Sequence, residues 1–219
     1  MTKPSNRRSF DHQPHRVGLF GGTFDPPTYA HLIAAEWAWQ QLNLEQVWFL
    51  LNKINPLKAG QTITEAAIRV QMLKDSISDC PHFQLETCEL QRPGVSYTYD
   101  TIIQLKERHP ELHFIFLAGA DIVKQIHYWH RSAELLEQVE FAVFNRGGYE
   151  LREEDQKIIP QMRQVIIPML EISSTLVRDR VRSGKSIRFL TPDGVCRLIQ
   201  KHSLYLKCDP ADVVSAVLG

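Results

Sequence analysis

The feature that most constrains the fold of this chain is a regular alternation between short apolar runs and longer amphipathic stretches. Short continuous apolar runs are typical of strands buried on both faces of a parallel sheet, and the stretches between them have helical periodicity. The apolar runs cover residues 17–20, 47–51, 83–89, 113–118, 139–144 and 165–167. The helical stretches cover residues 29–42, 65–76, 99–108, 122–138 (broken near residue 127), 153–163, 174–183 and 192–202. This order predicts a single α/β domain, a doubly wound, Rossmann-like parallel sheet with helices on both faces.

The two ends of the chain lie outside this alternation. Residues 1–15 are polar, contain two prolines and show no periodicity, so we expect a disordered leader there. Residues 16–205 are then expected to form the folded domain. Residues 206–219 contain a helix-start signal at Asp209 and Pro210, and we expect them to form a C-terminal extension.

The charge balance limits the partners that the chain can bind. With 25 Lys and Arg against 25 Asp and Glu, no broad positive field is available to hold a nucleic acid, so any anion site must be local. No apolar run reaches the roughly 18 residues of a membrane span, and the N-terminus lacks the apolar segment of a signal peptide. We therefore expect a cytoplasmic protein without membrane contact. The sequence leaves open whether it forms a homo-oligomer.

The cysteines and histidines do not form a pattern typical of a metal site. The four cysteines make no CxxC pair, and no HExxH motif occurs. His109 and His113 are spaced for one helix face, but Pro110 would break a helix between them. We expect no metal held by protein ligands alone.

The segment GGTFDPPTYAH, residues 21–31, follows the first predicted strand and leads into a helix. In doubly wound sheets ligands bind at the carboxyl ends of the strands, and paired glycines before a helix N-terminus can form a cradle for an anion. Thr28 and His31 lie one helical turn apart, so both could donate hydrogen bonds to a phosphate. The alternatives are a tight turn, an ordinary N-cap at Thr28 and a surface histidine.

A second hydroxyl-rich helix start occurs at ISSTLVR, residues 172–178. Ser173 is a plausible N-cap, and Arg178 follows Ser174 by one turn on the same face. Such a helix start could grip the phosphates of a nucleoside triphosphate. The alternative is a capped surface helix with solvated arginines.

These two segments resemble the GGTFDPxHxGH and ISSTxIR motifs of the nucleotidylyltransferase superfamily, specifically the bacterial nicotinate-nucleotide adenylyltransferases. The resemblance implies transfer of the adenylyl group of ATP to nicotinate mononucleotide, with Mg²⁺ carried by ATP. It implies that His31 and Thr28 act at the α-phosphate and that Lys58 and Arg178 act at the departing pyrophosphate. The implied ATP-binding residues are Gly21, Gly22, Thr23, Phe24, Ser173, Ser174 and Thr175.

Three further stretches and one tryptophan resemble the same family in the same order. Residues 52–58 are similar to its N-x-x-PPHK loop, residues 96–101 to its SYTxDT segment, and residues 119–121 to its G-x-D segment. By resemblance, Thr98 would bind the nicotinate carboxylate, Asp121 the ribose hydroxyls, and Trp129 would stack on the pyridine ring. The implied acceptor-binding residues are Asn52, Thr98, Gly119, Asp121 and Trp129.

The chain departs from the family pattern at Ala30, Leu57 and His130, where the family has glycine, histidine and tyrosine. Two alternatives therefore stay open from the sequence. The first is the same fold with another acceptor, such as nicotinamide mononucleotide. The second is a nucleotide-binding relative without catalytic activity.

Overall fold

The computed structural model describes residues 15–53, 63–145, 153–159 and 162–206. The predicted leader, apart from His15, and the C-terminal extension beyond Leu206 lie outside these ranges. His15 already belongs to the first strand, where it pairs with Leu112, so the predicted leader was one residue too long. No helix in the described ranges is long and apolar enough to cross a membrane.

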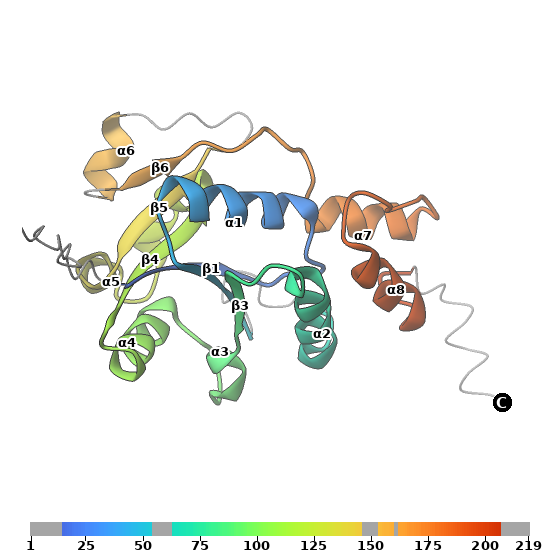
Figure 1. Cartoon of the computed structure of the whole chain (residues 1–219), viewed down its shortest axis with the longest axis horizontal. Helices are drawn as coiled ribbons and strands as arrows, with labels where there is room; N and C mark the ends of the chain where they lie inside the picture. Colours follow the sequence, from blue (N-terminus) through green and yellow to red (C-terminus); the bar gives the residue numbers. More distant parts are fainter. Residues whose placement is uncertain (1–14, 54–62, 146–152, 160–161, 207–219) are drawn as a thin grey trace, which may run out of the picture.

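The sheet has six parallel strands in the order β3-β2-β1-β4-β5-β6 (Figure 1). Their bounds are β1 His15–Gly22, β2 Gln46–Leu51, β3 Phe83–Glu86, β4 Leu112–Gly119, β5 Glu140–Phe144 and β6 Arg163–Val165. The chain runs outward from β1 to β3 and then crosses back to β4, so the strand order reverses between β1 and β4. The predicted doubly wound α/β sheet is confirmed, and a crevice is expected at this reversal.

Two buried apolar layers cover the faces of the sheet. On one face α1 (Tyr29–Gln41) packs through three small residues, Ala34, Ala35 and Ala38, together with α2 (Ala66–Ile77). On the other face α4 (Thr98–Arg108) and α5 (Ser132–Gln138) bury Ile102, Leu105 and Leu135. Figure 1 shows α1 above the sheet and α4 below it. Strands covered on both sides explain why the apolar runs are continuous rather than alternating.

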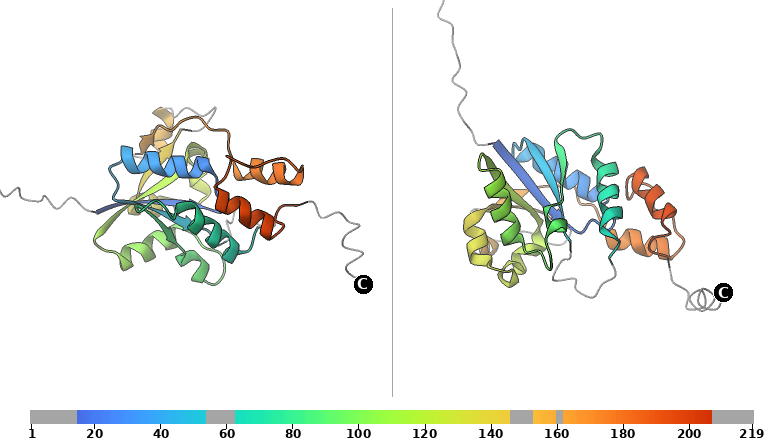
Figure 2. Two further views of the ribbon diagram at one scale, coloured as in Figure 1. Left: turned by 45° about the vertical axis from the view of Figure 1, so that its right-hand side comes forward. Right: turned by 90° about the horizontal axis from the view of Figure 1, so that it is seen from below.

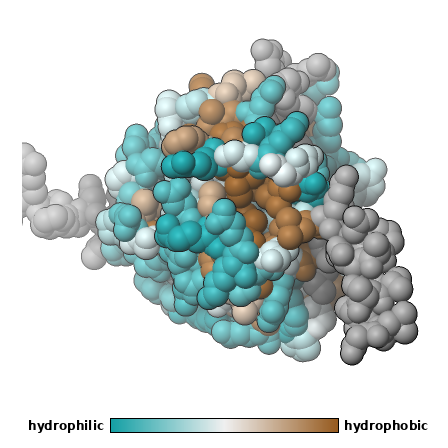
Figure 3. Space-filling model, turned by 90° about the vertical axis from the view of Figure 1, so that its right-hand side faces the viewer, coloured by the Kyte–Doolittle hydropathy of each residue, from teal (hydrophilic) through white to brown (hydrophobic). Residues whose placement is uncertain are grey.

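A third apolar cluster lies at one end of the sheet, where α7 (Ser174–Arg182) and α8 (Asp193–Lys201) pack against α2. Its buried members are Met72, Val177, Val195 and Ile199. Figure 2 shows α8 beside α2 in both views, and Figure 3, which faces this end, shows apolar surface framed by hydrophilic residues. The C-terminal helices are therefore part of the same domain as the sheet.

Several predicted boundaries are wrong for local reasons. The predicted strand 83–89 ends at Glu86, and a short helix α3 (Cys88–Gln91) follows. The predicted helix 153–163 ends as α6 (Glu153–Ile158), just before a proline at position 160, and Arg163 begins β6. The last strand was predicted at 165–167, but Ile167 pairs with the side chain of Asn145 instead of continuing the ladder.

The predicted helix 122–138 is broken, as expected, although the break extends further. It is divided into two 3₁₀ segments, η2 (Ala120–Lys124) and η3 (Ile126–Tyr128), followed by α5. Arg131, at the start of α5, has a left-handed backbone with φ of 52°. This irregular segment begins directly after β4 and therefore borders the expected crevice.

Candidate active site

A cleft of about 730 Å³ opens at the carboxyl ends of β1 and β4, where the strand order reverses. We call residues 20–25, His31, residues 172–175 and Arg178 the glycine-loop side of this cleft. We call residues 96–98, Phe116 and residues 128–130 its aromatic side. Both sets line the cleft. This placement follows the general rule that α/β sheets bind ligands where the strand order reverses.

The two hydroxyl- and glycine-rich motifs meet on the glycine-loop side. The Ser174 hydroxyl donates to the carbonyl oxygen of Pro26 at 2.7 Å, and Nη1 of Arg178 donates to the carbonyl oxygen of Asp25 at 2.7 Å. Ser173 caps α7 by accepting a hydrogen bond from the N–H of Leu176 at 3.1 Å. Residues about 150 positions apart in the sequence thus form one wall of the cleft.

The glycines allow the first loop to fold tightly. Phe24 has a left-handed backbone, with φ of 46°, which turns its ring back over Gly22. A Cβ atom on Gly22 would lie 2.8 Å from that ring, and one on Gly21 would lie 3.2 Å from Phe116. A side chain at Gly22 would therefore force the Phe24 ring to move, and one at Gly21 would press on the Phe116 ring.

His31 is fixed by contacts at one ring nitrogen. Its Nδ1 accepts a hydrogen bond from the N–H of Thr28 at 3.0 Å and lies 2.7 Å from the Thr28 hydroxyl. Phe24 packs against the imidazole edge-to-face, with ring centroids 5.2 Å apart. Because Nδ1 accepts from an N–H, the proton of the neutral imidazole is placed on Nε2.

Thr28 differs from its expected position. Its side chain is completely buried and is not among the residues that line the cleft. Its hydroxyl is directed at His31, as a helix N-cap residue paired with the third residue of the helix. Thr28 can therefore affect a phosphate only through the orientation of His31.

Arg69, which the sequence reading missed, connects the loops beneath the cleft. Its side chain is only 2% exposed. Nη1 donates to the carbonyl oxygens of Thr23 and Asn52, both at 2.9 Å, and Nε donates to that of Thr64 at 2.9 Å. Burial lowers the pKa of Arg69, while Asp25 opposes this shift. A buried cation thus joins the loops that follow β1 and β2.

The aromatic side is more open. Trp129 is half-buried and meets Phe116 edge-to-face, with centroids 5.9 Å apart. The rings of Tyr97 and His130 lie 4.4 Å apart, and Tyr128 is 75% exposed. His130 therefore pairs with another ring at the edge of the cleft.

The remaining predicted acceptor-side residues occupy three separate elements. Thr98 begins α4, Gly119 ends β4, and Asn52 follows β2, with its N–H donating to the carbonyl oxygen of Gly22 at 2.9 Å. All three line the cleft. Lys58 and Leu57 lie outside the described residues, as does the side chain of Asp121, whose backbone lies in η2.

A buried polar network lies behind the aromatic side, and the sequence reading did not identify it. Glu89 lines the cleft and accepts a hydrogen bond from the Thr101 hydroxyl at 2.9 Å, while Arg92 donates to the same hydroxyl at 2.7 Å. Burial raises the pKa of Glu89, and the Thr101 hydrogen bond and the charge of Arg92 oppose this rise. The network connects α3 to the start of α4.

The cytidylyltransferase-like family matches residues 19–180, so the chain belongs to a class of nucleotide-binding transferases. A protein of Geobacillus thermodenitrificans named "Probable nicotinate-nucleotide adenylyltransferase" is 44% identical over 190 residues, covering 87% of this chain and 86% of its own length. One from Exiguobacterium sibiricum with the same name is 42% identical, covering 87% of this chain and 98% of its own length. This chain belongs to the nicotinate-nucleotide adenylyltransferase family.

A solved structure has the same fold at lower sequence identity. The Plasmodium falciparum nicotinic acid mononucleotide adenylyltransferase complexed with NaAD aligns with a TM-score of 0.76 and 24% identity. The alignment covers 87% of this chain and 97% of that one. The core architecture is therefore shared across almost the whole length of that protein.

Proposed function

We propose that this protein transfers the adenylyl group of ATP to nicotinate mononucleotide, giving nicotinate adenine dinucleotide and pyrophosphate for NAD biosynthesis. The observation that carries the proposal is the meeting of the two motifs, with Ser174 and Arg178 bonded to the backbone of the loop at Asp25 and Pro26. The two motifs thereby form one wall of the cleft, in which the Ser174 hydroxyl and one N–H of Arg178 hold the glycine-rich loop in place. Relatives above 40% identity bear the corresponding name.

The reaction requires alignment more than chemical activation. An oxygen of the acceptor 5′-phosphate forms a bond to the α-phosphorus of ATP, and the bond from that phosphorus to the bridging oxygen breaks. The electron pair leaves with pyrophosphate. The attacking phosphate is already ionised near neutral pH, so no protein base has to remove a proton. The protein must align two polyanions and offset their repulsion.

The glycine-loop side suits the ATP half of this reaction. We assign the Nε2–H of His31 to the α-phosphate, with Thr28 holding the ring in the donating orientation. Arg178, Ser174 and Thr175 are assigned to the departing pyrophosphate, because they lie at the N-terminal turns of α7 and line the cleft. Lys58 remains a sequence-based candidate for the same role.

The aromatic side suits the acceptor half. Trp129 offers an indole face for the electron-poor pyridine ring, and Thr98 lies at the N-terminus of α4, where backbone N–H groups favour a carboxylate. Asn52, Gly119 and Asp121 are assigned to the rest of the mononucleotide. The same proposal places the enzyme in the cytoplasm without a nucleic-acid partner.

We propose that Mg²⁺ enters with ATP and is held mainly by phosphate oxygens and water. Within the described part of the chain, no three His, Cys, Asp or Glu side chains are grouped to hold a metal ion. Asp25 lines the cleft, but both of its carboxylate oxygens already accept hydrogen bonds from protein donors. When bound, the ion would neutralise charge on the triphosphate.

Initial rates of pyrophosphate release with ATP and Mg²⁺ test the proposal. We expect release with nicotinate mononucleotide, at least tenfold slower release with nicotinamide mononucleotide, and none without an acceptor. A preference for the amide would overturn the acceptor assignment. Tight ATP binding without pyrophosphate release from any mononucleotide would overturn the transfer activity.

A further inference from the structure

The Asp25 carboxylate is an unexpected group on the glycine-loop side. Asp25 lines a cleft that is proposed to hold two polyanions, yet it carries an acidic side chain and the residue is only 6% exposed. An unpaired carboxylate there would repel phosphate and would be costly to bury. Its hydrogen-bond partners therefore decide whether the loop can accept a triphosphate.

Each oxygen of Asp25 has a donor from a distant part of the chain. Oδ2 accepts from the N–H of Thr64 at 3.1 Å, in the segment before α2. Oδ1 accepts from the hydroxyl of Tyr205 at 2.5 Å, 180 residues away. The Thr64 hydroxyl donates in turn to the Tyr205 oxygen at 3.3 Å. Burial and the charge of Asp25 raise the pKa of Tyr205, so its hydroxyl stays protonated and able to donate.

Tyr205 is held in this position by the C-terminal cluster. Both Leu204 and Tyr205 pack against the buried core of α2, α7 and α8. Ser203 and Tyr205 have left-handed backbones, with φ of 48° and 62°, which residues other than glycine seldom adopt. These two turns reverse the chain after α8, so tertiary contacts determine the position of the hydroxyl.

Asp25 also transmits this constraint to a substrate-binding side chain. Its backbone carbonyl accepts the hydrogen bond from Nη1 of Arg178, whose Nη2 donates to the Thr175 hydroxyl at 3.2 Å. The Arg178 side chain is therefore oriented by the same residue whose carboxylate Tyr205 holds. A shift of Asp25 would both expose negative charge to the cleft and move the guanidinium.

We propose that Tyr205 is a positioning residue for the triphosphate end of the active site, acting through Asp25 on the loop at residues 21–25 and on Arg178. Its hydroxyl donates a hydrogen bond to the Asp25 carboxylate and thereby fixes the orientation of that side chain. The segment after α8 is thereby a functional part of the ATP site. This inference rests on the proposed function for its substrate.

The test compares Tyr205→Phe with Tyr29→Phe in the full chain. The first change removes the hydroxyl and keeps the ring, whereas Tyr29 does not line the cleft. For Tyr205→Phe we expect KM for ATP to rise about tenfold, the size of one hydrogen bond to a charged group. The dissociation constant of a non-hydrolysable ATP analogue should rise equally, while KM for nicotinate mononucleotide changes less than twofold. Tyr29→Phe should match the wild type.

A double-mutant cycle with Asp25→Asn identifies the route of the effect. Asp25→Asn removes the negative charge but also replaces one accepting oxygen by an amide N–H, so one of the two hydrogen bonds that hold the loop and Arg178 in place is lost. Asp25→Asn alone should therefore raise KM for ATP about tenfold, and adding Tyr205→Phe should then change it less than twofold. A full further tenfold loss would show that Tyr205 acts independently of Asp25 and would overturn the proposal. If Tyr205→Phe does not fold, an unchanged KM for ATP in Asp25→Asn overturns it.

Two other outcomes separate this inference from its alternatives. A lowered Tm with an unchanged KM for ATP, or equal rises in both KM values, would indicate a structural role and overturn the positioning role. If the wild-type protein turns over no mononucleotide, the proposed function fails. The analogue-binding measurements still decide the role of Tyr205 in that case.

Discussion

The two sides of the cleft are held in different ways. The glycine-loop side rests on buried charge: Arg69 at 2% exposure and Asp25 at 6% exposure bind backbone and side-chain groups from four segments. The aromatic side has ring contacts that reach from the buried Phe116 to the exposed rim, where Tyr128 is 75% exposed, and a network of hydrogen bonds around Thr101 lies behind them. Buried charge therefore fixes the backbone of the glycine-loop side, whereas on the aromatic side the family departure at His130 lies at the exposed edge.

Removing the buried cation should have the largest effect. In Arg69→Met, the carbonyl oxygens of Thr23, Asn52 and Thr64 lose their donor, so we expect a loss of about 3–5 kcal/mol in the free energy of unfolding. Chemical denaturation measures it, and the exposed Arg197→Met is the control. Arg69→Lys keeps the charge without the planar fork and should recover only part of the loss. A loss below 1 kcal/mol in Arg69→Met would mean that the loops after β1 and β2 do not depend on Arg69 for their stability.

Removing the imidazole should have the next largest effect, on catalysis rather than stability. For His31→Ala we expect kcat to fall about 10²- to 10³-fold with little change in KM, because the N–H is needed most when charge grows on the phosphate. His202→Ala, at the exposed end of α8, is the matched control. Thr28→Val should give a smaller loss of kcat, since it removes one contact to Nδ1. Turnover by His31→Ala equal to the wild type would contradict the assignment.

On the aromatic side, removing a whole side chain should have a smaller effect than removing the His31 imidazole. For Trp129→Ala we expect KM for nicotinate mononucleotide to rise about tenfold, from lost stacking and buried area, while KM for ATP stays unchanged. Steady-state kinetics with each substrate varied in turn measures the split, with Trp37→Ala on α1 as control. Trp129→Phe should keep most of the affinity. A rise in KM for ATP would mean that the two sides are not independent.

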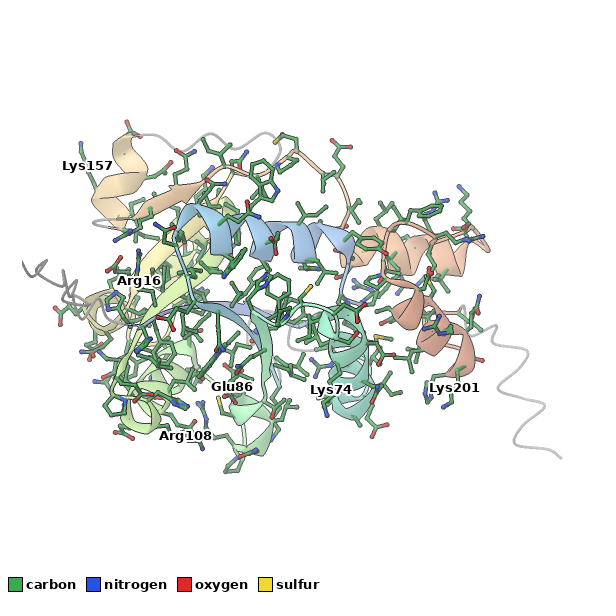
Figure 4. The ribbon with its side chains drawn as sticks, viewed as in Figure 1. Arg16, Lys74, Glu86, Arg108, Lys157 and Lys201 are labelled. Atoms are coloured by element: carbon green, nitrogen blue, oxygen red, sulfur yellow. The ribbon has the colours of Figure 1, made fainter. Side chains whose placement is uncertain are left out.

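The smallest effect is expected from a change at Glu140, which lies at the end of the sheet opposite the cleft. Its charge interacts with that of Arg16, which is labelled in Figure 4. Burial alone would raise the pKa of Glu140, but the hydrogen bond from His113 and the charge of Arg163 outweigh it, so the pKa is lowered from 4.5. A carboxyl group whose pKa is lower in the folded than in the unfolded protein stabilises the fold at a pH above its unfolded-state pKa. That contribution is lost as the pH falls through its folded-state pKa.

Because Glu140 begins β5 and does not line the cleft, Glu140→Gln should leave kcat and both KM values unchanged. It should also flatten the loss of stability as pH falls below about 4.5, measured by denaturation across pH, with Glu154→Gln on α6 as control. If the free energy of unfolding of Glu140→Gln falls as steeply with decreasing pH as that of the wild type, the lowered pKa of Glu140 is contradicted. Altered kinetics would show that the cleft is coupled to the far end of the sheet.

The fold and the outline of the cleft could be predicted because they depend on local patterns. Continuous apolar runs indicated the strands, and the two motifs at strand ends indicated which loops meet. The order of the sheet then places those loops at the β1–β4 reversal. The side-chain roles of the matched residues stay predictions, including that of Lys58.

The supporting residues could not be predicted, because their roles depend on long-range packing. Arg69 shares a helix stripe with Met72 and Leu73, and an arginine on that stripe was the available signal for a buried cation. Tyr205 gave no such signal, since its partner lies 180 residues away. Thr28 was predicted to contact a phosphate because its spacing from His31 puts both residues on one face of the helix. Spacing alone does not show which of the two side chains is buried.

Arg69 has a further consequence for how this enzyme works before any ligand arrives. Beyond the last hydrogen bond of a parallel ladder, the loops that follow the strands lose the backbone bonds that hold them and are more mobile. Here a single guanidinium fork ties together the carbonyl groups of Thr23 and Asn52 just past the ends of β1 and β2. These bonds fix the backbone at Thr23 and Asn52, so a nucleotide bound beside them would spend less binding energy on ordering these two positions.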